Sequence, residues 1–382
     1  MDALMLPSNW QRVRLGDIAE IIGGGTPSTQ ITSFWNGSIN WFTPTEIGIT
    51  KYVYKSQRTI TPLGLKNSSA KLLPIGTILL TSRASIGDCA ILKVVATTNQ
   101  GFQSLIPLEK INNEFLYYLI LTLKNKLLKL ASGSTFLEVS PNKIKNLLIP
   151  LPPLNEQIAI ANVLSDVDRY LYSLRALILK KESVKKALSF ELLSQRKRLK
   201  GFNQAWQKIR LGDILSYEQP TKFLVATTQY LQKGFTPILT AGKTFILGYT
   251  NDKHGIYTNI PVIIFDDFTT DSKMVNFPFK VKSSAIKILS LRDNNQADLK
   301  YIYEKLTLLK HQVTDHKRYW IDEFSNFEIL LPPLNEQIAI ANILSGLDHE
   351  IISLKNKKRQ FDNIKKALNH DLMSAKIRVL KK

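Results

Sequence analysis

The most regular hydrophobic pattern in the chain is a heptad repeat that occurs in two long segments. In the first segment, apolar residues recur in steps of four and three positions, at Ile160, Leu164, Val167, Leu171, Leu174 and Ile178. In the second segment, the corresponding residues are Ile340, Leu344, Leu347, Ile351 and Leu354, followed by Lys358. Such steps place side chains along one seam of an α-helix that packs against another helix. The pattern therefore predicts two long helices with buried seams.

Each of the two segments follows a Pro-Pro pair, and no glycine or proline occurs between Asn155 and Lys200. Proline is favoured near the start of a helix, and an acidic residue suits the first turn. A helix of about 38 residues is about 57 Å long at 1.5 Å per residue. We expect the two helices to pair antiparallel, because the block between them is long enough to return the chain. The alternative is that each helix packs only on its own domain.

The chain also contains an internal repeat. Residues 151–162 recur letter for letter as residues 331–342, which lie 180 positions later. A second matching pair opens each half, at Trp10 and at Trp206. The blocks between the matching segments differ in sequence and length, which indicates one plan used twice for two different targets. We place two variable domains at residues 1–150 and 201–330, and two helical segments at residues 151–200 and 331–382.

Both variable blocks contain short apolar runs of β-forming residues. Residues 76–80 and 261–265 are the strongest of them, and a second candidate strand follows each, within residues 94–105 and 277–289. The sequence therefore predicts an α+β protein with a pseudo-twofold internal repeat. In it, two mixed α/β domains are separated by two long helices that form an antiparallel coiled coil.

The charge balance indicates a polyanionic partner. The net charge is +20, from 51 basic and 31 acidic residues, and nucleic acid is the commonest partner of such chains. A generally lysine-rich proteome is the alternative source of this excess. Cys89 is the only cysteine, so an internal disulfide is excluded and a Cys-based zinc site is disfavoured. The sequence lacks a signal-peptide pattern and an apolar stretch of about 18 residues, so we expect a cytoplasmic protein without membrane contact.

Catalytic motifs are scarce. Asp271-Ser272-Lys273 has the D-x-K form of metal-dependent nucleases, with Asp252 as a candidate upstream carboxylate. The alternative is a solvated loop whose carboxylates cap turns or accept from cytosine amino groups. No amino-methyltransferase motif and no Ser/His/Asp arrangement stands out. We therefore expect a binding protein without catalytic residues, bound metal or cofactor of its own.

These features resemble the specificity subunit of type I restriction–modification enzymes, over nearly the whole chain. The resemblance is carried by the repeated Pro-Pro-Leu-Asn-Glu-Gln motif and by the openings of the two halves, at residues 149–157, 330–337, 10–18 and 206–214. Residues 133–144 are similar to the family's lead-in to this motif. Residues 314–327 depart from it, because they lack its Gly-Ser-Thr form.

The resemblance implies that each variable domain is a target-recognition domain, which reads one half of a bipartite sequence in double-stranded DNA. It also implies that the coiled coil acts as a ruler and docks methyltransferase subunits, of which we expect two. Restriction and motor subunits would join through that complex. The AdoMet and ATP chemistry of the family belongs to those partners, so the chain itself is expected to be non-catalytic.

The candidate DNA contacts are polar side chains of the variable domains. Amide side chains suit adenine and arginine suits guanine, whereas lysine suits phosphate. In the first domain the candidates are Lys66, Lys71, Ser82, Arg83, Thr98, Asn99, Gln100 and Gln103. In the second domain they are Lys243, Thr244, Asp266, Asp267, Thr269, Thr270 and Lys273. A structural role in a turn is the alternative for each of them.

The candidate partner contacts lie where the helices begin. They are Asn155, Glu156 and Gln157, with their copies Asn335, Glu336 and Gln337. The alternative is that these residues only cap the helices. Two other functions stay open: a stand-alone metal-dependent nuclease that uses Asp271 and Lys273, and a coiled-coil scaffold that binds DNA without sequence preference.

Overall fold

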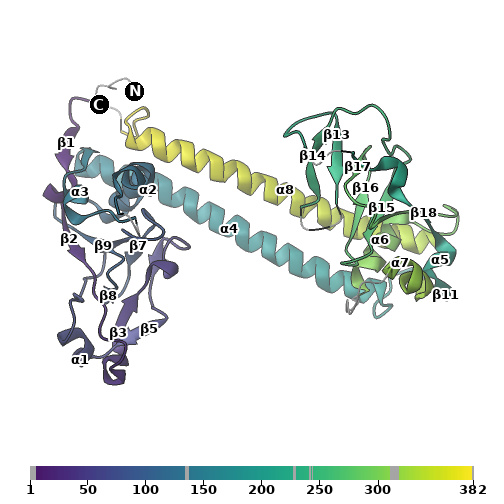
Figure 1. The fold of residues 1–382 in the computed structure, drawn as a ribbon, viewed down its shortest axis with the longest axis horizontal. Coiled ribbons are helices and arrows are strands. Elements are labelled where there is room, and N and C mark those ends of the chain that lie inside the picture. The colour runs from purple at the N-terminus through teal and green to yellow at the C-terminus, as the bar shows by residue number, and fades with distance from the viewer. Residues whose placement is uncertain are drawn as a thin grey trace. The chain divides into compact units, whose positions relative to one another are not determined.

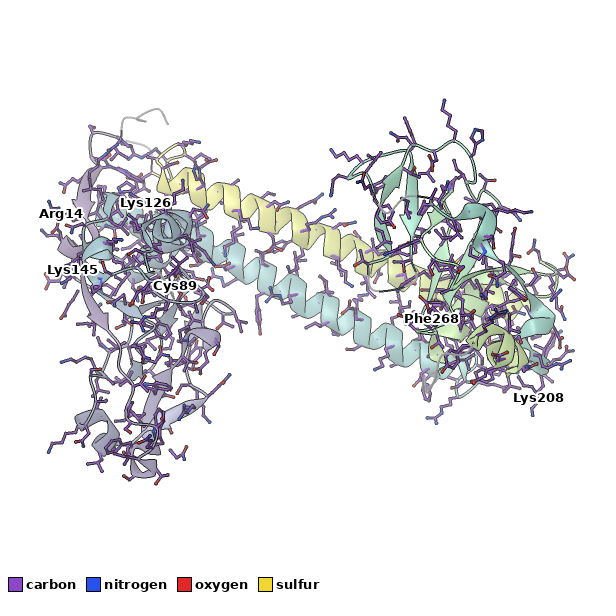
Figure 2. The ribbon with its side chains drawn as sticks, in the orientation of Figure 1. Arg14, Cys89, Lys126, Lys145, Lys208 and Phe268 are labelled. Carbon is purple, nitrogen blue, oxygen red and sulfur yellow. The ribbon has the colours of Figure 1, made fainter. Side chains whose placement is uncertain are left out.

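The computed structural model describes residues 6–133, 137–226, 229–240, 242, 244–309 and 318–380. The chain forms two compact units, which we call unit 1 (residues 1–175 and 357–382) and unit 2 (residues 176–356). Each unit combines one variable domain with a part of each long helix (Figure 1). Cys89 is buried in unit 1 (Figure 2), and burial raises the pKa of its thiol.

The two long helices are α4 (Leu154–Leu193) and α8 (Leu334–Met373), each of 40 residues. Both begin directly after a Pro-Pro pair, as predicted. Their heptad residues are buried or half-buried, and Leu164 and Leu344 are fully buried. The prediction of two long helices with buried seams is therefore confirmed.

In unit 1, the helix parts pack against each other in antiparallel order. Asp168 of α4 forms an ion pair with Lys365 of α8. Two residues further along α4, the ring of Tyr170 lies 4.7 Å from the ring of Phe361. The residue numbers rise along α4 as they fall along α8, which is the order of an antiparallel pair.

Unit 2 shows the same order. Lys181 of α4 forms an ion pair with Glu350 of α8, and Lys185 of α4 pairs with Asp348, with Nζ 2.6 Å from Oδ1. Contacts within each unit thus give the same direction. The antiparallel coiled coil is confirmed, and the alternative in which each helix packs only on its own domain is excluded.

The variable domain of unit 1 contains a two-stranded ribbon and two sheets. The ribbon pairs β1 (Gln11–Arg14) with β10 (Leu148–Leu151). The larger sheet has the order β2 (Ala19–Gly23), β9 (Gln103–Pro107), β6 (Ile78–Leu80), β7 (Cys89–Leu92) and β4 (Tyr52–Val53). The smaller sheet has the order β5 (Arg58–Ile60), β3 (Trp35–Phe42) and β8 (Ala96–Thr98). The helical elements are η1 (Leu15–Asp17), η2 (Thr32–Phe34), η3 (Pro44–Glu46), α1 (Pro62–Lys66), α2 (Asn113–Leu130) and α3 (Pro141–Lys145).

The main core of unit 1 joins the larger sheet to the coiled coil through α2. Asn112 caps α2, since its side chain accepts from the amide of Phe115 at 2.9 Å. Phe115 and Ile120 of α2 are fully buried in the core that also contains Ile78 of β6 and Leu164 of α4. Full burial of each such side chain stabilises the fold by about 1.5–3 kcal/mol. The variable domain of unit 1 is therefore packed onto the helices rather than merely tethered to them.

The variable domain of unit 2 repeats this layout with different lengths. Its ribbon pairs β11 (Gln207–Arg210) with β19 (Glu328–Leu331). One sheet has the order β12 (Leu215–Glu218), β18 (Ile286–Leu291), β15 (Val262–Asp266) and β16 (Ser272–Val275). The other has the order β14 (Ile246–Thr250), β13 (Thr236–Leu239) and β17 (Lys280–Val281). The helical elements are α5 (Leu211–Ile214), η4 (Pro220–Phe223), α6 (Leu299–Leu308), α7 (Tyr319–Asp322) and η5 (Phe324–Asn326).

The apolar runs expected to be strands are strands. Residues 76–80 contain β6 and residues 261–265 contain most of β15, both deeply buried. The following segments contain β8 and the start of β9 in unit 1, and β17 and the first part of β18 in unit 2. The mixed α/β character of both domains is thus confirmed. Within the part of the chain that the structure describes, every helix is too short or too polar to cross a membrane.

Candidate nucleic-acid interface

A buried carboxylate joins three parts of unit 1. Glu156, in the first turn of α4, is 1% exposed. Its oxygens accept from the indole Nε1 of Trp10 at 3.1 Å and from Nε and Nη2 of Arg378 at 2.6 and 2.9 Å. Trp10 opens the variable domain, and Arg378 follows the end of α8. Charge-assisted hydrogen bonds of this kind offset the cost of burying the carboxylate.

Unit 2 contains the same arrangement. Glu336, in the first turn of α8, is fully buried and accepts from Nε1 of Trp206 at 3.0 Å. Nε and Nη2 of Arg198 donate to it at 3.1 and 2.6 Å. We call each set a Trp–Glu–Arg clamp. The glutamates and the arginines of the two clamps are each 180 positions apart, so the internal repeat includes them.

The glutamine after each glutamate fastens the long helix to the variable domain. Gln157 accepts from the amide of Asn112 at 2.8 Å and donates to the carbonyls of Lys110 and Pro152. Gln337 accepts from the amide of Asp298 at 2.9 Å and makes the same kind of carbonyl contacts. Asn112 and Asp298 are the N-caps of α2 and α6. Each glutamine therefore links two helix starts.

These contacts bear on the candidate partner residues. Glu156, Gln157, Glu336 and Gln337 are at most 1% exposed and bonded inside their own units, so their side chains do not form part of the outer surface. Asn155 and Asn335 are exposed. Sequence reasoning recorded the two tryptophans only as repeat markers and missed Arg198 and Arg378, although their 180-position offset was a usable signal.

In unit 1, several DNA candidates lie in a rigid turn at residues 98–101, which we call the 98–101 loop. The side-chain oxygen of Asn99 accepts from the amide of Gly101 at 2.9 Å. The hydroxyl of Thr26 donates to the side-chain oxygen of Gln100. Buried Ser82 donates to the carbonyl of Gly101 through its amide at 2.8 Å and its hydroxyl at 3.2 Å. These bonds pre-organise Gln100, which is exposed.

The triple glycine at residues 23–25 packs against this loop. A Cβ atom on Gly24 would lie 1.9 Å from the carbonyl oxygen of Asn99, so no other residue fits there. The indole of Trp41 donates to the carbonyl of Gly25 at 2.8 Å, and the indole of Trp35 donates to the carbonyl of Ser28 at 3.0 Å. Two tryptophans thus hold the glycine-rich segment that supports the 98–101 loop.

The structure divides the candidates of the first domain by exposure. Lys66, Lys71 and Gln100 are exposed, while Arg83 and Asn99 are partly exposed. Arg83 is ion-paired with Glu138 at 2.8 Å. The buried candidates are Ser82, Thr98 and Gln103. Ser82 is bonded to the 98–101 loop, Thr98 is part of it, and Gln103 begins β9.

In unit 2, the two aspartates after β15 have internal roles. Asp267 is 3% exposed, pairs with buried Lys287 at 2.7 Å and accepts from the amide of Trp320 at 3.0 Å. Asp266 accepts from the amides of Phe268 and Thr269 at 2.8 and 3.2 Å, which is the pattern of a turn cap. Phe268 lies at this turn (Figure 2).

The other candidates of the second domain are more accessible. Thr244 and Thr269 are exposed, and Thr270 and Lys273 are half-buried. Lys243 lies outside the described residues. Asp252, the upstream carboxylate of the nuclease hypothesis, is bonded to Lys280 at 3.2 Å. Among the described residues, no group of three or more His, Cys, Asp and Glu side chains could hold a metal ion.

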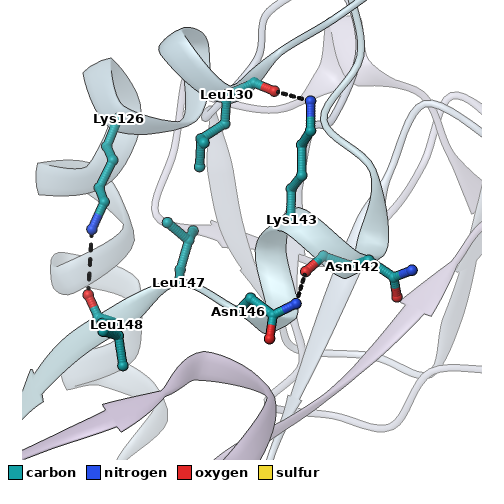
Figure 3. Close-up of a pocket in the computed structure, with 7 residues that line it drawn as sticks. All are labelled: Lys126, Leu130, Asn142, Lys143, Asn146, Leu147 and Leu148. Atoms are coloured by element: carbon teal, nitrogen blue, oxygen red, sulfur yellow. Dashed lines mark hydrogen bonds between the residues drawn. The ribbon is translucent and has the colours of Figure 1, made fainter.

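A depression of about 420 Å³ lies between α2, α3 and β10 (Figure 3). Its two ammonium groups are bonded to backbone carbonyls: Lys126 to Leu148 at 3.4 Å, and Lys143 to Leu130 at 2.9 Å. The amide of Asn146 likewise donates to a carbonyl of its own helix. Its ammonium groups are thus already bonded within the unit.

Comparison with known proteins agrees with this architecture. The specificity subunit of the type I restriction enzyme MjaIX from Methanocaldococcus jannaschii is 30% identical, over 98% of this chain and 95% of that protein. The EcoR124I/EcoR124II specificity subunit from Escherichia coli is 45% identical over 172 residues, which cover 44% of this chain and 41% of that one.

Solved structures give the same fold. The crystal structure of the type I restriction–modification S subunit from M. genitalium has a TM-score of 0.63 at 18% identity, over 97% of this chain and 98% of that one. The HsdS subunit from Thermoanaerobacter tengcongensis has a TM-score of 0.53 at 18% identity, over 98% and 99%. The sequence matches the type I restriction modification DNA specificity domain at residues 7–182 and again at residues 203–361. With two copies of this domain, the chain belongs to the family of type I restriction–modification specificity proteins.

Proposed function

We propose that this chain is the non-catalytic specificity subunit of a type I restriction–modification system, and that it binds a bipartite sequence in double-stranded DNA. The observation that carries the proposal is the pair of Trp–Glu–Arg clamps. They fasten two unlike domains to two equivalent helix starts. The two variable domains differ in sequence but are attached to the long helices in the same way. Such an arrangement allows one protein to read two different half-sites by the same mechanism.

The DNA-facing surface of each domain consists of the exposed candidates. In unit 1 these are Lys66, Lys71 and Gln100, and in unit 2 they are Thr244 and Thr269. The net charge of +20 favours binding to the phosphate backbone. The 98–101 loop is held by internal hydrogen bonds, and such pre-organisation lowers the entropy cost of binding. Ser82, Thr98, Gln103, Asp266, Asp267, Thr270 and Lys273 support these surfaces.

Two methyltransferase subunits dock on the repeated helix starts. The exposed residues Asn155, Ile158 and Asn162 recur as Asn335, Ile338 and Asn342. Ile158 and Ile338 are each 42% exposed. Internal packing accounts for the identity of buried residues in a repeat, but not of exposed ones. A partner that binds both helix starts through the same surface accounts for the identity of the exposed residues. Restriction subunits then join the complex of this chain with its methyltransferase subunits.

The coiled coil sets the spacing of the half-sites in this proposal. Helices of 40 residues are about 60 Å long, and half-sites one turn of DNA apart are separated by about 34 Å. The AdoMet-dependent and ATP-dependent chemistry is supplied by the partner subunits. The chain contributes recognition and positioning.

Footprinting tests the proposal. The chain assembled with a methyltransferase subunit should protect DNA in two short blocks separated by an unread spacer. A uniform footprint, or equal affinity for all sequences at physiological salt, would instead support a nonspecific scaffold. Magnesium-dependent cleavage by the purified chain alone, abolished by Lys273→Ala, would support the nuclease hypothesis.

A further inference from the structure

Arg58 of β5 carries a guanidinium group that is stacked on a tryptophan. Its Cζ atom lies 3.8 Å from the ring centroid of Trp35 and 5.4 Å from that of Trp41. The two indoles meet edge to face, with centroids 5.0 Å apart and planes at 87°. A distance of 3.8 Å is that of face-on stacking, which fixes the plane of the guanidinium.

The backbone around Arg58 is also fixed. Ser56 is 4% exposed, and its hydroxyl donates to the carbonyl of Arg58 at 2.5 Å. The same hydroxyl accepts from the amide of Trp41 at 2.9 Å. Trp41 is in turn anchored through its indole to Gly25. Arg58 is therefore held by its side chain and by its main chain.

The donors of Arg58 are available. The side chain is exposed, and no described residue accepts a hydrogen bond from it or forms an ion pair with it. Glu46, an acidic residue of this region, uses its carboxylate on the amides of Thr43 and Gln57 at 2.8 and 2.7 Å. Arg83, by contrast, is neutralised by Glu138. The guanidinium of Arg58 is therefore held in one orientation, with its donors free to bind an acceptor on a ligand.

We propose that Arg58 is a specificity-determining residue that reads a guanine in the major groove. The inference rests on the proposed DNA-binding function. Guanine presents O6 and N7 as adjacent acceptors, which match two parallel donors of one guanidinium. The stacking on Trp35 holds the fork in one plane and so pre-organises it for a bidentate contact. An arginine fork also fits a phosphate, but only a contact with a base edge changes the sequence that is read.

The sheet places this guanine in a particular half-site. Trp41 of β3 pairs with Arg58 of β5 on one side and with Thr97 of β8 on the other. Two strand spacings are about 10 Å, or about three base steps of 3.4 Å. The 98–101 loop follows Thr97 directly. Arg58 and the 98–101 loop thus belong to one sheet of unit 1, so we assign the guanine to the half-site that unit 1 reads.

Methylome sequencing tests this assignment. The chain is co-expressed with its methyltransferase subunit as wild type, as Arg58→Lys and as Arg58→Gln. Both variants should lose discrimination at one G·C pair of one half-site, by about tenfold or more, and leave the other half-site unchanged. Arg58→Lys keeps the charge and removes the fork. A loss confined to one base pair identifies a base contact, because a phosphate contact carries no sequence information. Arg12→Gln, at an exposed arginine of β1 without an aromatic partner, is the matched control and should keep the full motif.

A modified base gives a second measurement. Replacing the identified guanine by 7-deazaguanine removes N7, so it should weaken binding by the wild-type complex and leave the Arg58→Gln complex unaffected. A wild-type half-site without guanine on either strand, an unchanged motif in Arg58→Lys, or an equal loss of methylation at all sequences would overturn the assignment. If the wild type directs no bipartite methylation, the proposed function itself fails, which is a distinguishable result.

Discussion

Lys185 and Asp348 form an ion pair in unit 2, and the 180-residue offset of the repeat converts it into the pair of Lys365 and Asp168 in unit 1. Each domain helix adds its own partner to the shared aspartate. Lys300 of α6 donates to Asp348 at 3.0 Å, whereas Tyr118 of α2 donates to Asp168 at 2.6 Å. The equivalent aspartates of the two long helices thus bind different residues of the two variable domains. Each variable domain, together with its own helix α2 or α6, therefore forms one exchangeable unit.

Asp348→Asn should destabilise unit 2, because two lysines lose their shared carboxylate. The pair is mostly shielded, with side chains 22% and 30% exposed, and we expect a loss of about 1–3 kcal/mol at neutral pH. Urea denaturation measures it. The control is Glu350→Gln, at a residue that lies on α8 like Asp348 and forms a more exposed ion pair with Lys181 of α4. This variant should lose less than about 1 kcal/mol of stability. Equal losses in the two variants would contradict the assignment.

The same variant has a defined pH dependence. Burial opposes ionisation of Asp348, but hydrogen bonds from Lys185 and Lys300 outweigh it and hold the pKa of the carboxyl below its usual 3.8. A carboxyl with a lowered folded-state pKa stabilises the protein above its unfolded pKa and ceases to do so as the pH falls through the folded pKa. The deficit of Asp348→Asn should therefore be complete at pH 7 and shrink below about pH 4.

Glu336→Gln should loosen the clamp of unit 2. The fully buried carboxylate accepts from Trp206 and Arg198, and the neutral amide removes an acceptor and buries donors in its place. We expect a loss of about 2–4 kcal/mol and faster hydrogen exchange in residues 196–206. Glu328→Gln, at an exposed pair with Lys208, is the control and should change little. Unchanged exchange in Glu336→Gln would show that the clamp does not hold this segment.

Lys305 should make the stability of unit 2 depend on alkaline pH. Burial lowers the pKa of its ammonium from 10.5 to about 8. Between these values the unfolded chain binds the proton and the folded chain does not, so the free energy of unfolding rises with pH by about 1.4 kcal/mol per unit. Lys305→Met lacks this titration. The free energy of unfolding of Lys305→Met minus that of the wild type should be largest near pH 7 and should fall by pH 10. A difference that stays constant over this range would contradict the expectation.

Ile158→Asp and Ile338→Asp should each remove one methyltransferase subunit from the assembly, and the double variant should remove both. A charge on a buried apolar docking contact is strongly unfavourable, whereas both residues are 42% exposed in the chain itself. Native mass spectrometry counts the subunits. Ile352→Asp, an exposed isoleucine of α8 with no identical counterpart 180 positions earlier, should leave the count unchanged. Loss of both subunits in either single variant would argue against two independent sites.

The helices were predictable because their signals are local, and the repeat was predictable because its two copies are identical in sequence. Heptad spacing and Pro-Pro pairs fix α4 and α8 within a few residues, and apolar runs locate β6 and β15. The role of Glu156 was not decidable from the sequence, since its partners Trp10 and Arg378 come from distant positions. Ser82 and Gln103 are buried by tertiary packing, which could not be predicted from the sequence because polar residues are usually exposed. Arg58 was missed because its significance depends on Trp35, 23 positions earlier.

Exchange of one domain tests the central claim most directly, since it asks whether the two domains read DNA independently on a shared frame. Residues 201–330 are replaced by those of a relative, which keeps the incoming α6 with its own domain, and the methylated motif is sequenced. The account predicts that one half-site changes while the other half-site and the spacer length stay the same. A change in both half-sites, or in neither, would contradict it.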